Sequence, residues 1–247
     1  MLLSTKISEI VQQNFTYGYV LYYMGIKFFE YKECTLAEVC ASKGMDPKRV
    51  IADLEASVMP SSESSIDFQK YPVELIIQYL SHKHQEFTGR QLPYLSTLID
   101  KLPNHSQLNH IAEDLKFVFP LFVEDFINHI YEEEEKFFGY IRMLIDADRG
   151  IAHPSKLYYA IEEHSLEAFA EQHHGVDNEM DGIRSLTNNY VLSCENNLHF
   201  KATFEALRAF EEELLIHAKI ENEILFPKAI SLENKVRRNY MKIIRMN

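Results

Sequence analysis

Four long stretches of the chain repeat apolar residues every three or four positions, the spacing that gives a helix one apolar face. They run over about Pro72–Lys101, Gln107–Asp148, Pro154–Asn188 and Leu198–Ile230. Pro120 lies within the second stretch and is expected to kink the helix or to start it afresh. Four long helices with short connections predict an all-α protein built around a four-helix bundle.

A group of shorter helical patterns precedes these stretches. They run over Ser4–Phe15, Tyr17–Tyr23, Thr35–Lys43 and Asp46–Ala56. The third begins with a threonine that suits an N-cap and ends before Gly44. The segment Met59–Asp67 is rich in Ser and indicates a linker. We therefore expect a small helical domain over residues 1–60 and the helical bundle over residues 70–247.

Composition and charge narrow the class of protein. Only 8 Gly and 8 Pro occur among 247 residues, and 46% of the residues are apolar, which favours helices around a substantial core. A net charge of −12 argues against nucleic-acid binding, because an acidic surface repels phosphates. No apolar run reaches the roughly 20 residues that cross a bilayer, and the N-terminus lacks the pattern of a signal peptide. Cys34, Cys40 and Cys194 form neither a CxxC motif nor a disulfide framework, so we expect a cytoplasmic protein that binds no membrane.

Two His-x-x-x-Glu pairs, His129/Glu133 and His217/Glu221, are the most informative motif. Residues four apart lie on one face of a helix, and each pair interrupts an otherwise apolar stripe. Burying an ionised carboxylate without a partner costs several kcal/mol, and a pair of metal ions would supply the compensating charge. One such pair alone is more often a solvated helix face. Two pairs on apolar stripes of the second and fourth helices favour a metal site.

Further ligands would have to come from the first and third helices. His84 lies on the apolar stripe of the first helix. In the third, helix phase places His173 on the apolar face with Phe169, and places His174 on the polar face. His105, between the first two helices, is an even choice between a ligand and an ordinary loop histidine.

The order of these residues resembles a known family. The pattern H…H…HxxxE…H…HxxxE, closed by HAKIENEILFPKA over residues 217–229, resembles the hemerythrin-like domain of the repair-of-iron-centres (ScdA/YtfE-type) di-iron proteins. Residues 172–190, QHHGVDNEMDGIRSLTNNY, are similar to the third-helix signature of that family and place the ligand at His173. The N-terminal residues are similar to its small helical N-terminal domain, so the resemblance covers nearly the whole chain.

The resemblance implies a non-haem di-iron centre with an oxo or hydroxo bridge. It implies bridging by Glu133 and Glu221, and a set of five histidines that completes the ligands: His84, His105, His129, His173 and His217. The implied function is repair of iron–sulfur clusters damaged by nitrosative or oxidative stress, with the damaged iron–sulfur proteins as partners. From the residue types alone, manganese or zinc would also suit histidine and carboxylate ligands.

One departure from the family opens an alternative. The family carries two adjacent cysteines after a GIDF segment, and here Phe29 and Glu30 stand in their place, with Cys34 nearby. The alternative is a hemerythrin-like binding protein or sensor for dioxygen or nitric oxide. A structural protein with a vestigial site is a third reading, which the full ligand set argues against. The sequence leaves open whether the chain is an enzyme and whether it forms a homodimer.

Overall fold

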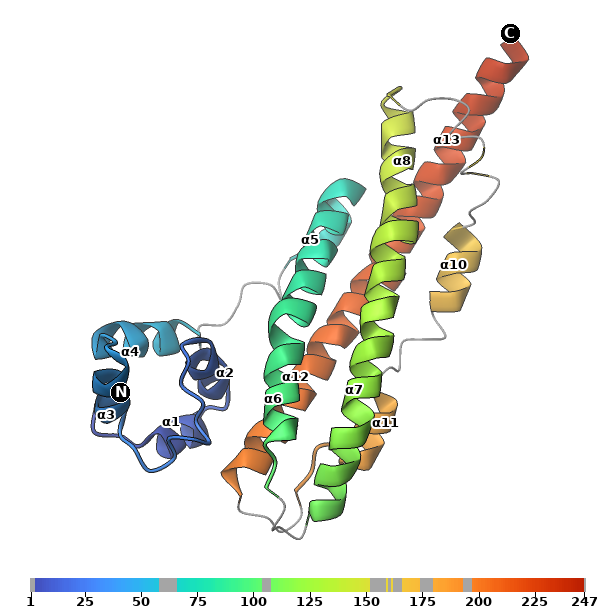
Figure 1. Cartoon of the computed structure of the whole chain (residues 1–247). Coiled ribbons are helices and arrows are strands. Elements are labelled where there is room, and N and C mark those ends of the chain that lie inside the picture. Colours follow the sequence, from blue (N-terminus) through green and yellow to red (C-terminus); the bar gives the residue numbers. More distant parts are fainter. Residues whose placement is uncertain are drawn as a thin grey trace. The chain divides into compact units, whose positions relative to one another are not determined.

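The computed structural model is helical, and its elements are shown in Figure 1. It describes residues 3–57, 66–103, 108–151, 159, 161, 166–173, 180–192 and 197–246, without the side chains of residues 168, 171–173 and 241–246. Within these ranges no strand forms, and the extended pairing is an isolated bridge between Lys6 and Thr35. The all-α prediction is confirmed.

Three of the predicted long helices consist of two α-helical parts joined by a π-helical segment. The three runs are α5 (Val73–Glu86), η3 (Phe87–Gln91) and α6 (Leu92–Asp100); α7 (Asn109–Glu132), η4 (Glu133–Phe138) and α8 (Gly139–Asp148); and α12 (Leu198–Ile220), η5 (Glu221–Leu225) and α13 (Phe226–Met246). The helix α7 continues through Pro120, so the expected restart there is wrong, while the expected kink stays a prediction. The predicted end near Ile230 is also wrong, because α13 continues to Met246 and its Val236 packs into the core.

Prolines account for two of the π-helical segments. A π-helical turn holds one residue more than an α-helical turn. Pro93 and Pro227 each lie at the second position of the α-helix that follows such a segment. A proline has no N–H to bond the carbonyl oxygen four residues earlier, which here belongs to the π-helical segment. The missing bond favours the wider turn in η3 and η5, whereas η4 is followed by Gly139 instead.

The third predicted helix lies only partly within the described residues. They include α10 (Leu166–His173) and α11 (Asp181–Leu186). After α11, Asn188 and Asn189 adopt φ angles of 50° and 56°, a left-handed region that asparagine tolerates better than most residues. Most of the predicted linker at Met59–Asp67 lies outside the described residues, so the domain boundary stays a prediction.

The fold divides into two compact units. The first comprises Met1–Ile66, Gln91–Pro120 and Gly182–Glu211. It contains α1 (Ile7–Gln13), α2 (Thr16–Tyr23), α3 (Leu36–Lys43) and α4 (Pro47–Ala56), which share one apolar core with Tyr94, Leu98 and Ala202. Thr35 and Glu38 form a capping box at the start of α3, and Gly44 ends that helix at a φ of 65°, as the sequence predicts.

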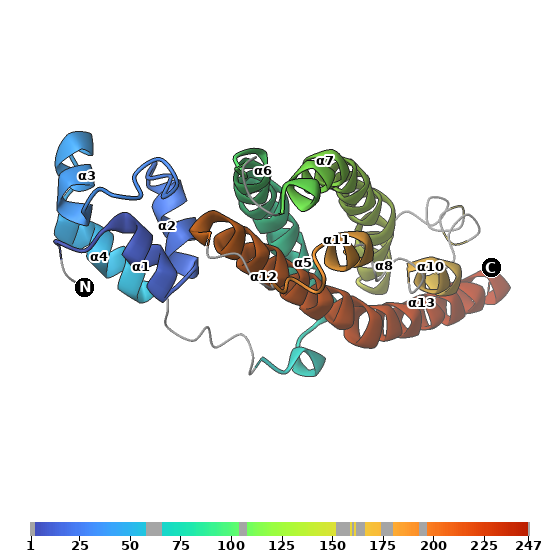
Figure 2. The same ribbon diagram turned by 90° about the horizontal axis from the view of Figure 1, so that it is seen from below.

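The second unit comprises Asp67–Arg90, Leu121–Asp181 and Glu212–Asn247. Here α8 packs along α13, α10 lies beside α13 in both views, and α5 contacts η5 (Figure 2). Its core combines Leu80, Phe138, Ile141, Leu144 and Leu225, all fully buried, with further apolar residues of the same helices. His84, Glu133, His217 and Glu221 lie within this unit.

A buried histidine is part of the first unit's core. His199, at the start of α12, is only 2% exposed. Its ring stacks on Phe29, with centroids 4.9 Å apart and planes at 15°, and its Nε2 donates to the Leu98 carbonyl oxygen at 2.9 Å. Burial lowers the pKa of His199 to about 4, outweighing the hydrogen bond to Leu98. The folded chain therefore holds this imidazole neutral.

Acid should destabilise the first unit through His199. Because the folded pKa lies below the unfolded value, stability falls as the pH drops from about 6.5 towards about 4, where the unfolded chain binds a proton that the folded chain does not. Between pH 7 and pH 4.5 this effect should lower the free energy of unfolding of the wild type by about 2 to 3 kcal/mol, and His199→Leu should not show this decrease. Urea unfolding at pH 7 and pH 4.5 measures it, with the exposed His110→Leu as the control. The same pH dependence in the wild type and in His199→Leu would contradict the prediction.

Candidate metal centre

The π-helical segments mark the positions of the polar side chains that the sequence singled out. The segment η4 begins at Glu133, and η5 begins at Glu221. The segment η3 begins three residues after His84. Such turns are rare and are frequently found at functional sites. Local geometry therefore points to the same residues as the two His-x-x-x-Glu motifs.

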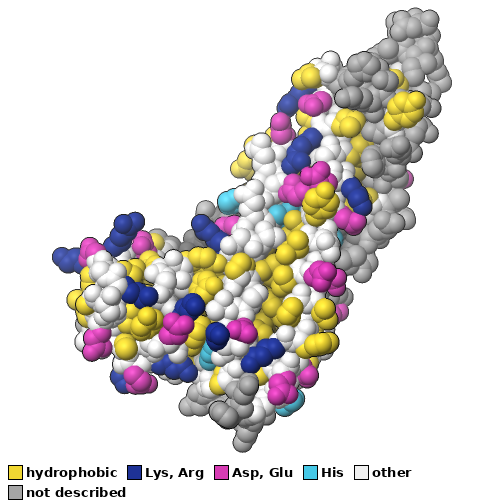
Figure 3. All heavy atoms as spheres, viewed as in Figure 1, with side chains coloured by type: hydrophobic (Ala, Val, Ile, Leu, Met, Phe, Trp, Pro, Cys, Tyr) yellow, Lys and Arg dark blue, Asp and Glu magenta, His cyan; other side chains and the backbone are white. Residues whose placement is uncertain are grey.

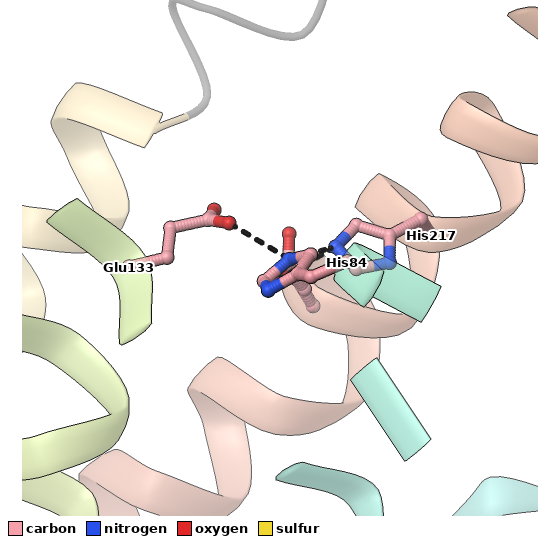
Figure 4. Close-up of side chains that lie close together, drawn as sticks. His84, Glu133 and His217 are labelled. Carbon is pink, nitrogen blue, oxygen red and sulfur yellow. Dashed lines mark hydrogen bonds and ion pairs between the residues drawn. The ribbon is translucent and has the colours of Figure 1, made fainter. Parts of the chain in front are cut away.

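His84, Glu133, His217 and Glu221 converge in the interior of the second unit. One ligand atom from each lies within 4.8 Å of the others, and none of the four residues is more than 8% exposed. The Nε2 atom of His84 is 3.2 Å from Glu133 Oε2 and 3.0 Å from His217 Nε2. The Nε2 atom of His217 is 3.2 Å from Glu221 Oε1. Figure 4 shows His84, Glu133 and His217 reaching toward one another from different helices.

His129 lies at the edge of this group. Its Nε2 atom is 3.1 Å from Glu133 Oε1, and its side chain is 23% exposed. Each oxygen of the Glu133 carboxylate thus contacts a different imidazole, His84 on one side and His129 on the other. A carboxylate held in this way can offer one oxygen to each of two cations.

The donor set fits a metal better than it fits a self-contained hydrogen-bond network. The Nε2 atoms of His84 and His217 lie 3.0 Å apart, so at most one of them can carry a proton. The other Nε2 atom must present its lone pair. Nδ1 of His217 is buried and has no hydrogen-bond partner among the described residues. Glu133 and Glu221, each 1% exposed, add two negative charges. A metal ion would accept the Nε2 lone pairs and offset the carboxylate charge.

Without a metal, a proton on His84 takes over part of this role. Burial lowers the pKa of His84, but hydrogen bonds to Glu133 and Glu134 and the charges of Glu133 and Glu221 outweigh it and raise the pKa to about 9. The cluster therefore favours a positive charge at its centre. A metal ion that binds there displaces this proton.

Aromatic rings enclose the cluster. Phe138 lies parallel to the His84 ring, with centroids 5.6 Å apart and planes at 5°. Phe87 meets the His217 ring edge-on at 5.5 Å. Both phenylalanines are essentially fully buried. Rings in these positions limit the access of water, and a low local dielectric strengthens the interaction between a cation and the carboxylates.

The structure brings together four of the seven ligands implied by the resemblance, with His129 beside them. His105 lies outside the described residues, and so does the side chain of His173 in α10. The preference for His173 over His174 therefore stays a prediction, as does the complete set of seven. Sequence reasoning missed Glu134, which contacts His84 at 2.9 Å. The signal was present in the run of four glutamates at residues 132–135.

The surface and the helix lengths bear on the predicted partners. On the face shown in Figure 3, acidic and basic side chains lie interspersed among one another. Within the described residues, none of the helices combines the length and the apolar character that a membrane span requires.

Removing either buried carboxylate should weaken metal binding. Glu133→Gln and Glu221→Gln keep the size of the side chain but remove its charge and an anionic ligand, so we expect the affinity for Zn²⁺ to fall about tenfold or more. Competition with a chromophoric chelator measures the affinity. The exposed neighbour Glu135→Gln is the matched control. Wild-type affinity in both carboxylate variants would show that the cluster is not the metal site.

Comparisons with known proteins agree with the resemblance seen in the sequence. No protein-family model matches the chain. The chain is 23% identical over 197 residues to the iron-sulfur cluster repair protein YtfE of Yersinia pestis (strain Pestoides F). The matched region covers 79% of this chain and 83% of that protein. It is 23% identical over 203 residues to a probable iron-sulfur cluster repair protein of Haemophilus influenzae, covering 81% of this chain and 80% of that protein. Over about four fifths of its length, the chain is thus similar to iron–sulfur cluster repair proteins of the YtfE type, and the resemblance stated from its sequence is confirmed.

Proposed function

We propose that this chain repairs iron–sulfur clusters damaged by oxidative or nitrosative stress, and that it holds a non-haem di-iron centre for this task. The names of its relatives support the repair function. The convergence of two buried imidazoles and two buried carboxylates is the structural observation that carries the proposal.

The proposed ligands fall into two groups. His84, Glu133, His217 and Glu221 would hold the metal, and His129 would join them at the edge. The family resemblance adds two further histidines, His105 and His173. Glu133 suits the role of a bridge, since its two oxygens already face different imidazoles. The proposal gives Glu221 the second bridge and expects an oxo or hydroxo group between the ions.

The residues around the centre would control its charge and its exposure to water. Bound iron would supply one-electron redox chemistry and open coordination positions. Glu133 and Glu221 would place two negative charges beside it, and such ligands favour the more highly charged oxidation state. Phe87 and Phe138 would exclude water from the imidazole side of the site.

At the two positions where the family has adjacent cysteines, this chain has Phe29 and Glu30, which make other contacts. Phe29 stacks on His199, and Glu30 is exposed and lies 3.7 Å from Lys27. Cys34 is half-buried and Cys40 is buried. A repair step that needs two adjacent thiols cannot take place at Phe29 and Glu30. We infer that repair by this chain relies on the metal centre alone.

The remaining assignments belong to the same proposal. Damaged iron–sulfur proteins would be the partners, in the cytoplasm, with neither nucleic acid nor membrane involved. Binding or sensing of dioxygen or nitric oxide is the alternative that the loss of the cysteine pair leaves in place. A homodimer is the assembly to be tested.

The metal content tests the first part of the proposal. Chain purified from iron-replete cells should hold about two iron ions and show absorption bands of oxo-bridged ferric iron, as expected for a di-iron bundle protein. Elemental analysis and an absorption spectrum measure both. Less than about half an iron per chain, after reconstitution with Fe²⁺, would refute the di-iron centre.

A cluster-repair assay separates the two functions. The reduced, iron-loaded chain should restore activity to a purified iron–sulfur enzyme whose cluster nitric oxide has damaged. The metal-binding variant Glu221→Gln should fail, because it lacks a proposed bridge. Fast, reversible gas binding without any restoration would instead support the sensor.

A further inference from the structure

The His84 ring is held from both of its nitrogen atoms. Nε2 faces the cluster, at 3.2 Å from Glu133 and 3.0 Å from His217 (Figure 4). Nδ1, on the opposite side of the ring, lies 2.9 Å from Oε1 of Glu134. Two consecutive glutamates of η4 therefore contact the same imidazole, one at each nitrogen.

The carboxylate of Glu134 has its own supports. Its Oε2 lies 3.5 Å from Nη2 of Arg142, and Ser81 also donates a hydrogen bond to it. The same guanidinium nitrogen lies 3.4 Å from the Ser81 hydroxyl. The Glu134 side chain is 28% exposed, whereas that of Glu133 is 2% exposed. Glu134 thus sits between the buried cluster and the surface.

Its position rules Glu134 out as a third carboxylate ligand, beside Glu133 and Glu221, and suits another role. The four convergent ligand atoms do not include it, and its oxygen contacts the ring nitrogen that points away from them. A histidine that binds metal through one nitrogen almost always donates its other N–H to a carboxylate, a backbone carbonyl or water. That bond fixes the ring orientation and the tautomer, and makes the metal-facing nitrogen more basic.

We propose that Glu134 is a positioning residue of the metal centre: it accepts the Nδ1–H of His84 and so directs the Nε2 lone pair of that ring into the cluster. This inference rests on the metal centre of the proposed function. Phe138, stacked on the His84 ring, restricts the tilt of that ring. Glu134 fixes the orientation of the ring within its plane and the tautomer of the imidazole. Arg142 and Ser81 keep the carboxylate aimed at the ring.

A matched set of three variants tests the role by affinity. Glu134→Ala removes the acceptor, Glu134→Gln retains a neutral oxygen, and Glu135→Ala changes an exposed neighbour on the same segment. We expect Glu134→Ala to bind Zn²⁺ about 10- to 100-fold more weakly than the wild type, in chelator competition. Glu134→Gln should recover part of the loss, and Glu135→Ala should match the wild type. Equal affinity for Zn²⁺ in all four chains would overturn the proposal.

A spectroscopic readout separates positioning from general damage to the fold. In the zinc-loaded wild type, ¹⁵N NMR should show His84 protonated at Nδ1 with a slowly exchanging proton. In Glu134→Ala that proton should exchange rapidly, while circular dichroism shows an unchanged helix content. A His84 signal identical to that of the wild type would overturn the positioning role even if affinity falls.

The same experiment distinguishes this inference from the proposed function. A wild-type chain that binds no Zn²⁺ would overturn the metal centre, and the role of Glu134 with it. A wild-type chain that binds Zn²⁺ beside an equally tight Glu134→Ala variant would overturn the role of Glu134 alone and leave the centre intact.

Discussion

Two carboxylates, Glu133 and Glu221, are each only 1% exposed inside an apolar unit, and this burial is the constraint to which the surrounding structure responds. Two neighbouring negative charges in a low-dielectric interior are stable only with positive charge beside them. The imidazoles of His84 and His217 each lie 3.2 Å from one of these carboxylates and can provide part of this charge, as a proton on His84. The Nε2 atoms of both imidazoles face these carboxylates and each other, an arrangement that suits ligands of one cation.

The charge cluster and the place of the missing cysteine pair belong to different units of the fold. The four convergent side chains, His84, Glu133, His217 and Glu221, lie within the second unit, and Phe29 and Glu30 belong to the first unit. At that place Phe29 covers a neutral, buried His199. In this chain that place therefore forms an apolar contact and carries no pair of adjacent thiols. Chemistry at iron would not depend on that contact.

Much of the fold and part of the site could be predicted from periodicity. The apolar stripes correctly indicated three long helices and the inward direction of His84, and the His-x-x-x-Glu spacing marked Glu133 and Glu221. Periodicity assumes 3.6 residues per turn, so it could not reveal η3, η4 or η5. It also could not assign a role to Glu134 beside Glu133, because that role depends on a contact with His84 on another helix. The helix through Pro120 shows how neighbouring turns tolerate one missing hydrogen bond.

Each π-helical segment also changes the direction in which the side chains of the following α-helix point. One additional residue per turn rotates the following helix by about 100° relative to an unbroken α-helix. The apolar face of α13 is thus set independently of the face that carries His217 on α12. A single long helix can therefore carry the proposed ligands on the face of its first part, α12, and the core contacts on a different face of its second part, α13. Loss of one residue in η5 would leave His217 in place and turn the packing surface of α13 away from its core, so this helix can accept substitutions far more easily than deletions.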